Sequence, residues 1–359
     1  MLIVDAHEDI AWSALTFSRD YTTSAHHIRA SEAGSDTPAQ NGSACLGRKE
    51  WISGKVGVIF ATLFVSPYRR RLGAWDHMCY RDADEAYRLA RKQLDYYLRL
   101  ENDNSIWRII RNRADLNIVT SSWERGAENR NLIGITLLME GADPIRTPDD
   151  VANWQEQGVR IIGPAWAGTR YCGGTGDPGP LTSVGEELLE NMSDCGIILD
   201  VSHMSERSFD QAVERYESVI IASHANPRFA AELSTPERGL TDDQIRKLAD
   251  RDGVIGIIPY NRFLRTGWHP IDGKQTVDVK RVAETMDYIC QLTGSNLNVG
   301  IGSDFDGGFG TESIPHPMDS VADLHMIGEA LAKLNYEPEQ ITQMLSGNWL
   351  TVMQRGLPD

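Results

Sequence analysis

The chain has 359 residues, 41% of them hydrophobic, and its 51 acidic against 35 basic residues give a net charge of −16. This length and apolar content allow a large core, and α/β barrels often reach this size as a single domain. The acidic balance argues against a nucleic-acid partner, because phosphate binding needs a basic surface. We therefore expect one domain over residues 1–359.

The apolar runs, the N-terminal stretch and the cysteines indicate where we expect the protein to be located. No run of about 18 apolar residues occurs, so we expect no membrane span. The N-terminal stretch lacks the basic start and cleavage site of a secretory signal, which favours a cytoplasmic location. The five cysteines are scattered and include no C-x-x-C pair, as is typical of reduced thiols. Whether Cys79 and Cys172 form a disulfide stays open.

Short apolar runs alternate with helical stretches along the chain. The predicted strands span residues 2–7, 56–65, 132–139, 159–165, 197–202, 218–223, 254–259 and 297–303. Amphipathic stretches that predict helices lie between them, at 84–101, 184–194, 206–216 and 279–292. Near-continuous apolar strands that alternate with helices indicate a parallel sheet. Eight of them predict a (β/α)8 TIM barrel, with a doubly wound open sheet as the alternative.

Two turn-rich stretches interrupt this alternation. Residues 31–55 are polar and predict a surface excursion within a long loop at about 10–55. Residues 169–183 are rich in Gly and Pro, which predicts a second irregular loop at 166–183. Long loops in compact folds are often functional.

The first predicted strand contains the segment VDAHED. Asp5, His7 and Asp9 alternate in it, so their side chains share one face of a strand. Converging buried polar groups are costly to desolvate unless something binds them. Imidazole and carboxylate are both ligands of divalent metals. The alternative is a polar strand end that hydrogen-bonds within the protein.

Polar side chains also follow later strands. Glu140 follows the third predicted strand, His203 the fifth and His224 the sixth, while Asp304 and Asp306 follow the eighth. Each has an ordinary alternative as a core or turn residue, and Asp306 is expected to form a turn. In a barrel, however, the carboxyl ends of all strands meet at one rim, where the chemistry of this fold lies. Their joint placement favours a metal-dependent active site at that rim.

Five of these residues form a candidate ligand set for two divalent ions: His7 and Asp9 for one, His203 and His224 for the other, and Glu140 as the bridge. Zinc is favoured, and manganese or iron would suit the same donors. Two ions roughly 3.5–4 Å apart can share a hydroxide and hold both the attacking and the departing oxygen of a hydrolysis. Asp304 would take the proton of that water and return it to the leaving amine.

At these residues the chain resembles the membrane (renal) dipeptidase family, the binuclear zinc dipeptidases of the amidohydrolase superfamily. The segments that carry the resemblance are DAHED (5–9), MEGAD (139–143), GPLTSVGEELLENMSDCGIILDVSHMSE (179–206), SHAN (223–226), ERGLTDDQI (237–245), GIGSDFDGG (300–308) and GNWLTVM (347–353). The resemblance implies a (β/α)8 barrel and hydrolysis of small dipeptides, often with a C-terminal D-residue, by attack of a metal-bound hydroxide. It also implies two zinc ions, and a homodimer is the family-based expectation.

The resemblance assigns the same five ligands, with Glu140 as the bridge, and makes Asp304 the acid/base and amine-binding aspartate. It makes Arg238, in ERGL, the arginine that grips the substrate carboxylate, a task for which a bidentate guanidinium is well suited. Without the resemblance, Arg238 is expected to be a solvated surface arginine.

One position departs from the family pattern. The family typically has a histidine after the fourth strand that supports the tetrahedral intermediate, whereas this chain has Trp166. An indole N–H donates one hydrogen bond but cannot carry positive charge or shuttle a proton. Either Arg170 or Tyr171 takes that role or the substrate differs, and Trp166 could also be a packing residue. The alternatives are a catalytically retired barrel that binds a ligand or partner, and a hydrolase of another small amide, lactam or lactone.

Overall fold

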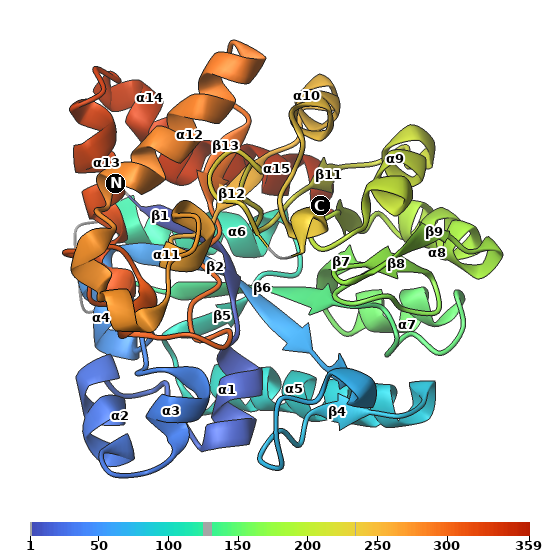
Figure 1. Cartoon of the computed structure of the whole chain (residues 1–359). Helices are drawn as coiled ribbons and strands as arrows, with labels where there is room; N and C mark the ends of the chain where they lie inside the picture. Colours follow the sequence, from blue (N-terminus) through green and yellow to red (C-terminus); the bar gives the residue numbers. More distant parts are fainter. Residues whose placement is uncertain (1, 125–130, 234) are drawn as a thin grey trace.

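The computed structural model describes residues 2–124, 131–233 and 235–359. Its central strands are parallel and surrounded by helices (Figure 1): β1 (Ile3–Glu8), β2 (Val56–Phe64), β6 (Ile133–Glu140), β7 (Val159–Gly163), β10 (Ile198–Asp200), β11 (Ile220–Ile221), β12 (Ile255–Ile257) and β13 (Val299–Ile301). Every residue of β2 and β6 is buried, because side chains point both into the barrel and towards the helices. These eight strands lie within or overlap the predicted runs.

The strands pair in the order β11-β10-β7-β6-β2-β1-β13-β12. A parallel bridge between Ala222 and Ile255 joins the two ends of this order. The amide of Ala222 donates to the carbonyl of Val254 at 3.0 Å, and the amide of Gly256 donates to the carbonyl of Ala222 at 2.8 Å. The result is a nearly closed eight-stranded parallel barrel, which confirms the predicted fold class.

The predicted helices form close to their expected bounds. They are α5 (Ala83–Asp103), α8 (Ser183–Asp194), α9 (Glu206–Arg215) and α12 (Lys280–Thr293). Side-chain caps fix two of the starts, because Asp82 accepts from the amide of Glu85 and Thr182 accepts from the amide of Gly185. The remaining helices of the outer layer are α6 (Arg113–Glu124), α7 (Asp150–Glu156), α10 (Asp242–Asp250), α11 (Asn261–Leu264), α13 (His325–Ala332), α14 (Pro338–Thr342) and α15 (Asn348–Gly356).

Several short strands lie outside the barrel order. β5 (Trp107–Ile109) pairs with the first half of β6, and β3 (Ser66–Pro67) pairs with β4 (Cys79–Tyr80). None was predicted, because two or three residues are too few to show an alternating pattern.

The segment 10–55 does not form the long loop that its polar composition predicts. It contains four short helices, α1 (Ile10–Phe17), α2 (Ala25–Glu32), α3 (Thr37–Asn41) and α4 (Arg48–Gly54). Buried Asp306 binds this segment to the barrel rim: it accepts from the hydroxyl of Tyr21 at 2.6 Å and the amide of Cys45 at 2.7 Å, and lies 3.1 Å from Nη1 of Arg19. Buried polar residues of the segment also pair with one another, as Arg19 does with Glu32 and Asn41 with Ser13, so polar composition does not exclude ordered structure here.

The segment 166–183 also differs from its prediction as irregular chain. β8 (Cys172–Gly174) and β9 (Asp177–Leu181) form an antiparallel hairpin. β9 pairs with β8, and positions of an edge strand whose amides face away from the partner need no hydrogen-bond acceptor. Pro178 and Pro180, which have no amide hydrogen, can therefore be accommodated in β9.

Two further expectations concern cysteines and membranes. Cys79 and Cys172 are both free thiols, as are the other three cysteines, so the open question of a disulfide is answered in the negative. Within the described ranges, no helix combines the length and the apolar character that a bilayer crossing requires.

Candidate metal centre and active site

The carboxyl end of β1 supplies two of the candidate ligands. His7 and Asp9 lie on one face and are almost fully buried. Asp5 has a different task, because its Oδ1 accepts from the amide of Ser303 at 2.7 Å and so joins β1 to the segment after β13. Oδ1 of Asp9 accepts from the hydroxyl of Thr62 at 2.7 Å, which leaves its Oδ2 facing His7.

Glu140, the last residue of β6, lies between histidines from different strands. Its Oε2 is 3.6 Å from Nε2 of His7. Its Oε1 is 3.1 Å from Nε2 of His203 and 3.4 Å from Nε2 of His224. The two oxygens of this carboxylate therefore face imidazole nitrogens from different strands.

His203 and His224 converge on one point. Their Nε2 atoms are 3.0 Å apart, and Nδ1 of His203 lies 3.0 Å from the hydroxyl of Thr175. His203 has a φ of 65°, in the left-handed region. Such backbone strain in a residue other than glycine is common at functional sites.

Asp304 completes the cluster from the segment after β13. Its Oδ1 is 3.9 Å from Nε2 of His7, and its amide donates to the carbonyl of His7 at 3.0 Å. Its φ of 60° is also left-handed. His7, Asp9 and Asp304 form one group whose ligand atoms lie within 4.8 Å of one another, and His7, Glu140 and His224 form a second.

The electrostatics of the cluster favour a cation. Burial alone would lower the pKa of His7, but the carboxylates of Glu140, Asp9 and Asp304 outweigh it and raise this pKa to about 10. Burial raises the pKa of Asp9 to about 6 and that of Asp304 well above its usual range. Nε2 of His7 is buried and has no hydrogen-bond partner among the described residues. An orphaned imidazole nitrogen that faces several carboxylates fits a divalent metal ion.

A cavity of about 490 Å³ opens in front of this cluster. Beyond the cluster itself, aromatic side chains form part of its wall, among them Trp12, Phe64, Trp166, Tyr260, Phe263 and Phe309. Arg238, in a short 3-10 helix, also lines it and is only 6% exposed, so the expectation of a solvated surface arginine is wrong. Its Nη1 donates to the carbonyl of His224 at 3.0 Å, while its buried Nη2 lacks a hydrogen-bond partner in the described part of the chain.

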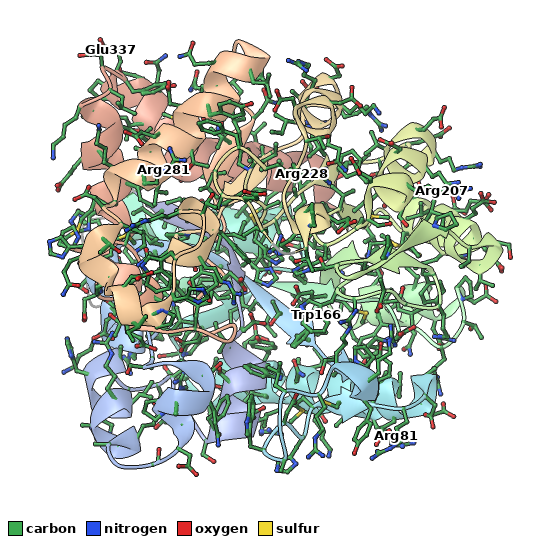
Figure 2. All side chains as sticks on the ribbon, in the orientation of Figure 1. Arg81, Trp166, Arg207, Arg228, Arg281 and Glu337 are labelled. Carbon is green, nitrogen blue, oxygen red and sulfur yellow. The ribbon has the colours of Figure 1, made fainter. Side chains whose placement is uncertain are left out.

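Of the three residues proposed around the missing histidine, only Trp166 reaches the cavity. Its ring packs edge-on against Phe64 at 5.1 Å and lies 6.3 Å from the ring of His203, near the centre of the view in Figure 2. Arg170 instead donates to Asp143 at 3.1 Å. The hydroxyl of buried Tyr171 donates to the carbonyl of Ile145.

Arg170 and Tyr171 therefore cannot take over the role of the missing histidine in this structure. The segment before β8 turns both side chains back onto residues 143–146, away from the cavity. Sequence proximity to Trp166 suggested them, but the direction of their side chains is set by this turn.

Several hydroxyls behind the ligands escaped the sequence analysis. Thr62, Thr175 and Ser223 each contact a candidate ligand. Thr62 could have been found as the lone hydroxyl in the apolar run VGVIFATLFV. Thr175 and Ser223 give no such signal, because hydroxyls are common in loops and at strand ends.

Comparisons with known proteins identify the family of this chain. Residues 1–356 match the family described as membrane dipeptidase (peptidase family M19). An uncharacterized dipeptidase of Schizosaccharomyces pombe is 28% identical over 320 residues, which is 84% of this chain and 70% of that protein. An uncharacterized protein from the pqqA 5′ region of Klebsiella pneumoniae is 32% identical over 216 residues, 57% of this chain and 75% of that protein.

The fold is also similar to that of a solved relative. A metallopeptidase from Rhodobacter sphaeroides, liganded with a phosphinate mimic of the dipeptide L-Ala-D-Ala, superposes with a TM-score of 0.74 at 21% identity. The match covers 99% of both chains. Because the family match spans nearly the whole sequence, this chain belongs to the membrane dipeptidase family, peptidase family M19, which is a family of metallopeptidases.

Proposed function

We propose that this protein hydrolyses small dipeptides with two zinc ions. The observation that carries the proposal is the division of Glu140, with Oε2 towards His7 and Oε1 towards His203 and His224. The residues that would hold the ions are His7 and Asp9 for one, His203 and His224 for the other, and Glu140 for both. When bound, such a pair supplies Lewis-acid polarisation of the scissile carbonyl and activation of a water molecule.

The chain's own groups account for substrate binding and proton transfer. Arg238 has a buried guanidinium nitrogen to spare, which would bind the carboxylate of the dipeptide. Two cations beside Asp304 would offset its burial and keep it ionised. It would then accept the proton of the attacking water on its carboxylate and deliver it to the leaving amine. The dipeptide mimic bound to the Rhodobacter relative supports this class of substrate, including a C-terminal D-residue.

A second candidate keeps the metal centre but changes the bond. Trp166 places an aromatic ring at the cavity wall where the family pattern has an imidazole. A hydrolase of another small amide, lactam or lactone would explain this substitution. A retired site is less well supported, because Asp304 serves no evident structural purpose by its side chain and stays beside the ligands.

Metal analysis combined with a substrate panel tests the proposal. Purified protein should contain two zinc ions per chain and should hydrolyse some of a panel of L,L and L,D dipeptides. Glu140→Gln should hold fewer ions, because the amide offers one oxygen in place of two. Two ions without dipeptide turnover would favour the lactam or lactone alternative. A wild-type protein with no metal would overturn the proposal.

A further inference from the structure

Ser223 lies behind two candidate ligands at once. Its hydroxyl oxygen is 2.8 Å from Nδ1 of His224, 3.4 Å from Nδ1 of His7 and 2.5 Å from Oδ2 of Asp200. All four residues are at most 1% exposed, so solvent cannot substitute for these contacts. His7 lies on β1 and His224 follows β11, two strands that are not neighbours in the pairing order, and Ser223 is where their Nδ1 atoms meet.

The direction of each hydrogen bond follows from counting protons. Oδ1 of Asp200 already accepts from the amides of Ser202 at 3.0 Å and Ser223 at 2.9 Å, so its Oδ2 takes the hydroxyl proton of Ser223. A hydroxyl has one proton and two lone pairs. With its proton donated to Asp200, Ser223 can only accept, and it does so from Nδ1–H of both histidines. Both Nε2 atoms are then left with a lone pair that faces Glu140.

We propose that Ser223, oriented by Asp200, is a positioning residue that sets the Nδ1–H tautomer of His7 and His224 together. This inference rests on the two-ion centre proposed above, because the two histidines belong to different ions there. One hydroxyl thereby prepares both metal positions, and its removal weakens both. Partners behind metal-bound histidines change metal affinity by about 10- to 100-fold.

The chain contains a matched control. Ser202 precedes His203 as Ser223 precedes His224, and both serines are almost fully buried. Ser202 accepts from the amide of His224 at 3.1 Å, whereas Nδ1 of His203 lies against Thr175 at 3.0 Å. Ser202→Ala therefore removes a buried serine of equal size whose hydroxyl contacts that of Ser223 at 3.4 Å but contacts no imidazole nitrogen of the centre.

Cobalt(II) in place of zinc gives the readout. In proton NMR of the cobalt-loaded protein, each metal-bound histidine should give one shifted, exchangeable Nδ1–H signal. Ser223→Ala should speed the solvent exchange of two of the three signals, and Ser202→Ala should leave all three unchanged. Thr175→Val should affect only the third. Competition with a chelator should show a loss of about 10- to 100-fold in affinity for both ions in Ser223→Ala alone.

Asp200→Asn tests the direction of the hydrogen bonds. The two amides at Oδ1 hold the oxygen of the new side chain in place, so its NH₂ faces Ser223. The hydroxyl then has Nδ1 of His224, Nδ1 of His7 and Oγ of Ser202 as its acceptors, at 2.8, 3.4 and 3.4 Å. Nδ1 of His224 is the nearest of them, and donation to it moves the proton of this histidine to Nε2, where it blocks metal binding. We expect a larger loss of cobalt affinity than in Ser223→Ala.

The outcomes separate this inference from the proposed function. A purely structural role, in which Asp200 and Ser223 only join β10 to β11, would lower the melting temperature of Ser223→Ala but leave its exchangeable signals and affinity unchanged. That result would overturn the inference while the two-ion centre stands. A wild-type protein that binds no cobalt would refute the centre itself. If Asp200→Asn fails to fold by circular dichroism, Ser223→Ala still decides.

Discussion

Arg238 gives the most direct test of how substrate binds. Its Nη1 holds the carbonyl of His224 at 3.0 Å, while the buried Nη2 remains available in the described part of the chain. The guanidinium can therefore support the backbone beside a ligand and bind a carboxylate at the same time. In Arg238→Lys a single ammonium has to serve one of these two partners, because lysine lacks the planar fork.

The expected magnitude follows from the lost contact. A hydrogen bond to a charged group contributes about 1.5–3 kcal/mol, which corresponds to roughly 10- to 150-fold in kcat/KM. The carboxylate takes no part in the bond changes and is bound in both the ground state and the transition state, so most of the loss should appear in KM. Steady-state kinetics with L-Ala-D-Ala and L-Ala-L-Ala, on protein with verified metal content, measure both parameters.

The C-terminal amides of the same dipeptides are the control. They lack the carboxylate, so Arg238→Lys should change their kcat/KM by no more than about threefold. Equal losses for the free acids and the amides would refute the reasoning. Arg238 would then act through the backbone of His224 and not on the substrate.

Three further changes test separate parts of the structure. Asp304→Asn should keep both metal ions in metal analysis but lose turnover, since an amide cannot accept the proton; full activity would remove Asp304 from the mechanism. Asp306→Asn should lower the free energy of unfolding by about 3 kcal/mol, because buried Arg19 loses a carboxylate 3.1 Å away; an unchanged urea midpoint would contradict this. Burial alone would raise the pKa of Glu101, but hydrogen bonds from Arg111 and a backbone amide hold it below 4.5. The stabilisation by Glu101 is therefore complete above that pH and is lost as the pH falls through the lowered pKa of the folded state. Glu101→Gln should destabilise the protein at pH 7 and cost progressively less as the pH falls below 4.5; a cost that does not change with pH would contradict this.

The barrel and the location of its rim could be predicted because both depend on short-range pattern. Parallel strands that are buried on both faces produce continuous apolar runs, and the first polar residue after such a run must lie at the carboxyl end. His7, Glu140, His203 and His224 were found in this way, and the structure brings them within a few hydrogen-bond lengths of one another.

Features that depend on contacts between distant segments could not be predicted in this way. Asp306 resembled a local turn, yet it binds Arg19, Tyr21 and Cys45 from the helical segment 10–55. Asp306 lies more than 250 positions along the chain from these three partners, the nearest of which is Cys45. No local sequence pattern indicates contacts over such a separation.

Three of the candidate ligands are held by a hydroxyl from an element other than their own. Thr62 on β2 binds Asp9, which follows β1, and Thr175, between β8 and β9, binds His203, which follows β10. Ser223, which follows β11, reaches back to His7 on β1. A nearly closed barrel holds neighbouring strands in fixed register. Contacts from one strand to the next therefore fix the positions of the ligand atoms relative to one another. These hydroxyl residues contact neither metal nor substrate. Replacing one of them should change the free energy of metal binding more than the free energy of unfolding. A packing residue should show the opposite ratio, which distinguishes it from a positioning residue.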